Sequence, residues 1–147
     1  MIEDAISRLK IHLSEVPEKF SKFSEKELST PPAPGKWSKK EILGHLIDSA
    51  CNNHNRFVLS QFESEPVMLI KYSQDEWVTV QNYCKEDSQK ILDLWKAYNT
   101  HILHIFETYP KDKLEVKWDI QGDIQTSEWL IIDYVDHMEH HLKQIFK

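Results

Sequence analysis

The sequence predicts an all-α protein, a four-helix bundle built as a single domain over residues 1–147. Three observations favour this fold. The chain contains only three glycines, and glycine is among the residues that most weaken a helix interior. Four long segments repeat apolar side chains three and four residues apart, which is the spacing of one helix face. Stretches rich in turn residues separate these segments, as the connections of a bundle do.

The first predicted helix covers about residues 3–23. Pro17 lies inside its apolar pattern and predicts a kink or a split, because proline removes one helical hydrogen bond. The stretch 29–35, which reads S-T-P-P-A-P-G, is expected to interrupt helical structure. The apolar stripe of this helix consists of Ile2, Ile6, Leu9, Leu13, Val16 and Phe20.

The second predicted helix starts at Ser38 and continues to about Phe62. The Ser38 hydroxyl and the Glu41 carboxylate have the spacing of a capping box, which satisfies the first free N–H groups of a helix. The stretch 63–72 contains a proline and is expected to be a loop. A short helix is expected to follow from Ser73, which has a glutamate three residues later.

The third predicted helix covers residues 87–109, where apolar side chains again form one stripe. Residues 114–126 alternate apolar and charged side chains and contain Gly122, which predicts a short hairpin or irregular segment. The fourth helix is expected from Ser127 to the C-terminus, with Thr126 as its N-cap.

Composition excludes several classes of protein. The net charge is −6 and the basic residues are scattered, so no nucleic-acid partner is expected. No apolar run approaches the roughly 20 residues that span a bilayer, and the amphipathic N-terminus lacks the apolar core of a signal peptide. We therefore expect no membrane partner and a cytoplasmic location. Cys51 and Cys84 do not form a C-x-x-C motif and are expected to be buried or half-buried thiols.

Two of the eight histidines fall on the apolar face of the fourth helix. His137 and His141 are four residues apart, which stacks their side chains about 6 Å from each other, whereas His140 lies on the polar side. Neutral imidazole is the commonest metal ligand, and burying two imidazoles without partners is costly. A shared metal ion would provide the partner, and so would hydrogen bonds to the backbone or to carboxylates. This helix by itself leaves both interpretations open.

A polar stripe on the second helix favours the metal. His45, Ser49, Asn52 and Arg56 follow one another at helical spacing beside the apolar face. A stripe that faces solvent is typically rich in lysine and glutamate, whereas this one holds His, Ser, Asn and a single Arg. That composition suits the wall of a polar pocket, with a solvated flank as the alternative.

Two motifs carry a family resemblance. The segment W-S-x-x-E-I-L-G-H-L-x-D-S at residues 37–49, with N-N at 52–53 and R-F at 56–57, resembles the second helix of the DinB/YfiT-like superfamily. The segment D-H-M-E-H-H-L-K-Q-I at 136–145 resembles its fourth helix, which carries an H-x-x-x-H pair. Their order and separation also match, and the resemblance extends over essentially the whole chain.

The resemblance implies a four-helix bundle in which His45, His137 and His141 bind a divalent metal ion. It also implies a metal-dependent enzyme that acts on a small-molecule substrate. Members of the superfamily include proteins assigned as metal-dependent hydrolases, and metal-dependent thiol transferases or isomerases that use low-molecular-weight thiols. The sequence does not choose between hydrolase and transferase, and a non-catalytic metal-binding or stress-response module is the alternative to both.

Three histidine ligands leave one coordination position for water or substrate, as in catalytic zinc sites. Zinc is the expected ion, although nickel, iron and manganese also accept imidazole, and a low-molecular-weight thiol is a candidate second cofactor. Asp48, and with less weight Asp136, could orient an imidazole; a surface position is the alternative for Asp48. Arg56 could hold an anionic substrate group or form a structural salt bridge. Asn52 could bind a metal-bound water or cap a backbone group.

The other histidines are not expected to be ligands. His12, His101 and His104 lie on the flank or the polar side of their helices. His54 falls near the apolar side of the second helix, where packing or a subunit contact is expected. The chain also carries five tryptophans. Apolar surface left over by a four-helix bundle is often buried against a second copy, so we expect a homodimer.

Overall fold

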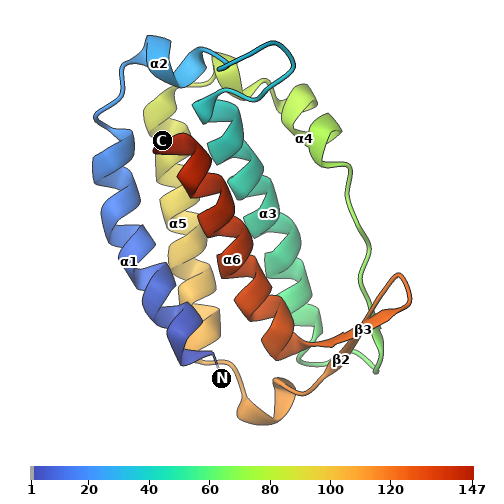
Figure 1. Ribbon diagram of the computed structural model, residues 1–147. Helices are drawn as coiled ribbons and strands as arrows, with labels where there is room; N and C mark the ends of the chain where they lie inside the picture. The colour runs from blue at the N-terminus through green and yellow to red at the C-terminus, as the bar shows by residue number, and fades with distance from the viewer. Residues whose placement is uncertain (1) are drawn as a thin grey trace.

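The computed structural model of the chain describes residues 2–147. Its framework is a bundle of four long helices, which are α1 (Glu3–Phe20), α3 (Lys39–Leu59), α5 (Ser88–Glu107) and α6 (Ser127–Ile145) (Figure 1). The shorter elements are α2 (Glu25–Ser29), α4 (Gln74–Gln81), the 3-10 turns Tyr83–Lys85 and Lys111–Lys113, and the strands β1 (Val67–Met68), β2 (Lys117–Ile120) and β3 (Asp123–Thr126). The expected helical bundle is therefore present. A strictly all-α description is incomplete because of the small sheet.

The helices surround one apolar core. α3 packs against α5 and α6, and α1 packs against the same two helices, so α1 and α3 occupy opposite corners of the bundle. α3 and α5 run in one direction while α1 and α6 run in the other, so α3 and α6 are antiparallel neighbours (Figure 1). The largest fully buried side chains include Trp95, Phe57, Phe106, Phe20 and Met138. None of the helices in the described part of the chain is both long and apolar enough to cross a membrane.

The first helix differs from the prediction at its end. α1 stops at Phe20, and it is one uninterrupted helix that contains Pro17 in its last turn, so the chain is not split there. A separate helix, α2, follows and ends at Ser29. The Ser24 side chain and the Glu27 carboxylate form a capping box at its start. That S-x-x-E spacing is a recognised start signal, so the sequence contained the information for this missed helix.

The predicted start signals of α3 and α6, the helices that carry His45, His137 and His141, are confirmed. Ser38 and Glu41 form the capping box of α3, and the Thr126 hydroxyl accepts a hydrogen bond from the Trp129 N–H of α6. α3 ends at Leu59, three residues before the predicted end. α4 begins after Ser73 as expected, although the Ser73 side chain forms no capping hydrogen bond.

A three-stranded sheet closes one end of the bundle. The predicted hairpin is β2–β3, with Lys117 opposite Thr126 and Ile120 opposite Asp123, and Gly122 adopts a φ of 95° in its turn. β1 was predicted as loop; it pairs in parallel with β2, and Val67 lies opposite Trp118. A two-residue strand has no sequence pattern of its own. This pairing brings the segment after β1 beside the helix pair α3–α6.

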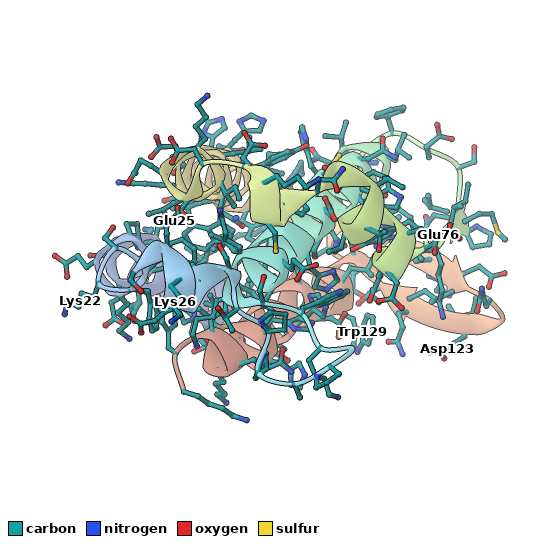
Figure 2. The ribbon with its side chains drawn as sticks, turned by 90° about the horizontal axis from the view of Figure 1, so that it is seen from above. Lys22, Glu25, Lys26, Glu76, Asp123 and Trp129 are labelled. Atoms are coloured by element: carbon teal, nitrogen blue, oxygen red, sulfur yellow. The ribbon has the colours of Figure 1, made fainter. Side chains whose placement is uncertain are left out.

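The view along the bundle axis in Figure 2 shows the four long helices end-on. α4, which carries Glu76, and the hairpin, which carries Asp123, lie on the same side of the bundle, while Lys22 and Lys26 lie on the opposite side (Figure 2). The chain between β1 and α4 thus covers one flank of the bundle rather than its core.

Candidate metal centre

His45 reaches the interior from the second turn of α3 and is completely buried. The glycine before it is required by packing. A Cβ atom on Gly44 would lie 2.2 Å from the Tyr83 ring, closer than any real side-chain contact. The Tyr83 ring therefore lies directly against the α3 backbone beside His45, and its hydroxyl donates a 2.6 Å hydrogen bond to Asp48.

His137 and His141 reach the same point from α6. The Nε2 atoms of His45 and His137 are 3.3 Å apart, and the His141 ring centroid lies 4.6 Å from each of the other two centroids. One ring nitrogen from each histidine can be chosen so that all three lie within 4.8 Å of one another. The three predicted imidazoles therefore converge, although His45 is far from the other two in sequence.

The chemistry of this cluster fits a metal ion. Two imidazole nitrogens bound tetrahedrally at about 2.0–2.1 Å lie about 3.3 Å from each other, which is the Nε2 separation of His45 and His137. The Gln144 amide oxygen accepts a 2.9 Å hydrogen bond from His141 Nδ1. That contact leaves the Nε2 lone pair of His141 free for a ligand bond.

Burial keeps the cluster uncharged. Desolvation, followed by the neighbouring His141 and His137, lowers the pKa of His45 to about 3. Desolvation, His141 and His140 lower the pKa of His137 to about 4. Desolvation is also the largest cause that lowers the pKa of His141. Neutral imidazole is the form that binds a metal, so protons do not compete for the three lone pairs at neutral pH.

The two carboxylates considered as imidazole partners lie elsewhere. Asp48 is buried, which excludes the surface alternative. Its Oδ1 accepts hydrogen bonds from Tyr83 and from Gln81 Nε2, so it anchors the segment after α4 instead of a histidine. Burial is the largest cause that raises its pKa. Asp136 forms an ion pair of 2.9 Å with Arg8 of α1 on the outside of the bundle.

The residues of the polar stripe on α3 have different surroundings. Asn52 donates to the Asp48 backbone carbonyl, which is its backbone-capping alternative. Ser49 is buried, and together with Asn53 and Arg56 it lines a cavity. The salt bridge considered for Arg56 is not formed with any described residue. Its guanidinium instead donates to the Asn53 Oδ1 and to the backbone carbonyl of Ile70.

Two cavities meet the histidine cluster from different sides. The first has a volume of about 280 Å³, runs between α3 and α6, and includes His137 in its wall. The second has a volume of about 680 Å³ and includes His141 and Trp37. The Trp37 ring, which lines the second cavity, lies 4.9 Å from the His45 ring and 6.4 Å from the His141 ring, so it covers the cluster on that side. The sequence reasoning missed Asn53 and Asp133, which line the first cavity.

The remaining histidines and the cysteines stand apart from the cluster. His12 contacts Glu139, and His54 contacts the Tyr98 hydroxyl. Within residues 2–147, only the three converging histidines form a group able to hold a metal ion. Cys51 and Cys84 are free and exposed, so the expectation of buried or half-buried thiols is wrong. The Cys84 Sγ atom lies 3.3 Å from the Ser38 hydroxyl at the start of α3.

Several known proteins that are similar to this chain are named as metal-dependent hydrolases. The chain is 26% identical over 139 residues to the Bacillus subtilis protein named "Putative metal-dependent hydrolase YfiT", a match that covers 90% of this chain and 78% of that protein. A Bacillus cereus protein named "Putative metal-dependent hydrolase" is 27% identical over 77 residues, which is 52% of this chain and 44% of that protein.

Solved structures with the same fold include YfiT from Bacillus subtilis, with a TM-score of 0.87, 22% identity and coverage of 97% of this chain and 82% of that one. A mycothiol-dependent maleylpyruvate isomerase follows the same fold with a TM-score of 0.70 and 13% identity, over 97% of this chain and 60% of that one. The model of the DinB superfamily matches residues 8–145. The chain therefore belongs to the DinB superfamily.

Proposed function

We propose that this protein is a metal-dependent enzyme that acts on a small molecule, with a single divalent ion held by His45, His137 and His141. The observation that carries the proposal is the convergence of three neutral imidazoles from two helices, with the Nε2 atoms of His45 and His137 3.3 Å apart. The relatives named as metal-dependent hydrolases support the same class of function.

Zinc is the ion we expect, because three imidazoles with an open fourth position are a common arrangement in zinc enzymes; nickel, iron and manganese are the other candidates. When bound, such an ion supplies Lewis-acid chemistry and lowers the pKa of a water or thiol beside it. The protein's part is to orient the rings and limit water. Gln144 orients the His141 ring, and Trp37 covers the cluster.

Hydrolase and thiol transferase differ in how many organic molecules the site must hold. Hydrolysis requires one organic substrate and water, whereas transfer to a low-molecular-weight thiol requires two organic molecules at once. The two cavities flank the cluster on its His137 and His141 sides. This arrangement favours the thiol transferase as a second candidate beside the hydrolase suggested by the relatives' names.

The first test is metal content. We expect about one equivalent of metal per chain in the purified protein and its loss in the variants His45→Ala, His137→Ala and His141→Ala. His140→Ala is the matched control, because His140 is a neighbouring but exposed histidine of the same helix. Full metal content in all three variants, or an equal loss in His140→Ala, would contradict the proposed site.

The second test separates catalysis from a purely structural ion. The metal-loaded protein is assayed for ester or amide hydrolysis and, in parallel, for consumption of a low-molecular-weight thiol with an electrophile. A catalytic ion predicts that His141→Ala loses turnover with a modest fall in melting temperature, whereas a structural ion predicts mainly a loss of stability. The homodimer expected from the aromatic content stays a prediction, for which sedimentation of the full chain is the measurement.

A further inference from the structure

The first cavity extends from the histidine cluster along the antiparallel pair α3–α6. Ser49, Asn53 and Arg56 line it at successive turns of α3, and His137 and Asp133 line it from α6. Apolar and aromatic side chains complete its wall, and they are Leu69, Tyr72, Ile120, Trp129, Leu130 and Tyr134. The cavity therefore has a candidate metal-binding end at His137 and a basic end at Arg56, with both polar and apolar side chains in the wall between them.

The guanidinium at the basic end is not neutralised. The sequence has two arginines, and they differ in their ion pairs. Arg8 forms ion pairs with three carboxylates, those of Asp4, Asp136 and Glu139. Arg56 is half-buried and has no carboxylate partner among residues 2–147. A partly buried charge without a counter-ion is costly, and burial accordingly lowers the pKa of Arg56.

Arg56 is nevertheless held in place. One terminal nitrogen donates a 2.9 Å hydrogen bond to the Ile70 carbonyl, and the other donates to Asn53 Oδ1 at 3.3 Å. A guanidinium has five N–H donors, so donors remain available on a side chain whose position is already fixed. Lys71, which is exposed, lines the same cavity and adds a second positive charge.

The two ends lie within reach of one small molecule. Eleven residues separate His45 from Arg56, which is about 16 Å along a helix. Helical side chains lean towards the N-terminus, and the contact of Arg56 with Asn53 agrees with that direction. His45 leans the same way, so the separation is shortened only because the arginine side chain is longer. The guanidinium therefore lies on the order of 10 Å from the histidine cluster along the cavity.

We propose that the substrate is a small organic carboxylate whose anionic group binds Arg56 and Lys71 while its reacting group reaches the three-histidine cluster. The inference rests on the proposed metal-dependent function and specifies its substrate class. A carboxylate suits the guanidinium because it accepts two parallel hydrogen bonds. Asp133 lines the same cavity one turn from His137. Because α6 runs antiparallel to α3, Asp133 lies between His137 and the Arg56 end of the cavity. Its negative charge disfavours a doubly charged group such as phosphate.

The test uses thiols as probes, because a thiol can occupy the metal while its other end samples the cavity. The full-length protein is loaded with Co²⁺, and ω-mercaptoalkanoates of increasing length are titrated by their effect on the visible absorption of the metal. Each acid is paired with the ω-mercaptoalkanamide of the same length. We expect the acid to bind at least about tenfold more tightly than the amide at a chain length that spans about 10 Å, and no such preference for the shortest chains.

Variants then locate the anionic group. Arg56→Gln should abolish the preference for the acid while leaving the metal content and amide binding unchanged. Lys22→Gln is the matched control for the loss of one positive charge, since Lys22 lies on the far side of the bundle (Figure 2), and it should retain the preference. Lys36→Gln removes a charge from the second cavity and should retain it as well.

Several outcomes would overturn the inference. They are equal binding of acid and amide at every length, a preference that survives Arg56→Gln, and a preference that disappears in Lys36→Gln, which would place the anion in the second cavity. Each of these leaves the proposed metal site standing. A protein that binds no Co²⁺ would instead refute the proposed function, and this inference with it.

Discussion

Gly44→Ala should destabilise the protein, although alanine is the better helix former. Gly44 lies inside α3, where exchange to alanine alone would stabilise the helix by about 1 kcal/mol. The added Cβ would lie 2.2 Å from one Tyr83 ring carbon and 2.5 Å from another, so the ring must move. Displacement of a buried side chain by overpacking costs about 1–3 kcal/mol. Weakening the Tyr83–Asp48 hydrogen bond costs about 1–3 kcal/mol more. We therefore expect a net loss of about 1–5 kcal/mol.

The assay is urea unfolding of four proteins that form a double-mutant cycle. In the Tyr83→Ala background the ring is absent, so Gly44→Ala should change sign and stabilise the protein by up to about 1 kcal/mol. This reversal is the specific result, because a glycine needed for backbone flexibility would be destabilising to replace in both backgrounds. A neutral or stabilising effect of Gly44→Ala in the natural sequence would refute the packing argument.

Three further predictions follow from the structure. Removal of the metal by a chelator should lower the melting temperature, since an ion present at 100 times its dissociation constant stabilises the fold by about 2.7 kcal/mol, and a variant with His141→Ala should show no such shift. Tyr134→Phe should cost about 1–3 kcal/mol in urea unfolding, because the Tyr134 hydroxyl donates a 2.6 Å hydrogen bond to Asn99 and the completely buried Asn99 would keep an unsatisfied oxygen; an unchanged midpoint would contradict this. Both cysteines should react with a thiol reagent in the native protein, and Cys84 should react slowly because burial raises the pKa of that thiol. The Cys84→Ser variant should retain one reactive thiol. If neither thiol reacts, the exposure of Cys51 is disproved.

The helix starts at Ser38 and Thr126 were predictable because capping depends on residues three positions apart. The convergence of His45 with His137 and His141 was also accessible, since the apolar face of each helix must point to a common core and the family motif identifies which histidines belong together. The strand β1 could not be predicted from the sequence. Two residues pair with β2 about fifty positions later, and no local pattern records such a contact.

The residues in the wall of the first cavity show why the role of a side chain is harder to predict than the helix that carries it. Asp48, considered as an imidazole partner, and Arg56, a member of the polar stripe, both lie on α3, but their surroundings differ because different segments cover them. The turn after α4 covers Asp48 and gives it hydrogen bonds from Tyr83 and Gln81. The chain after β1 reaches Arg56 and offers only a backbone carbonyl from Ile70.

The difference in the surroundings of Asp48 and Arg56 separates a charge that is held by the fold from one that is available to a ligand. The Asp48 carboxylate has two donors on one oxygen, and they tie α4 and the following turn to α3. Its other oxygen is buried and has no hydrogen-bond partner among residues 2–147. The Arg56 guanidinium has positioning contacts but no opposite charge among the described residues. Asp133 lines the same cavity but forms no ion pair with Arg56, and residues 69–72, which pack across Arg56, supply a lysine and a tyrosine. An anionic ligand is therefore the counter-ion that this part of the fold leaves room for.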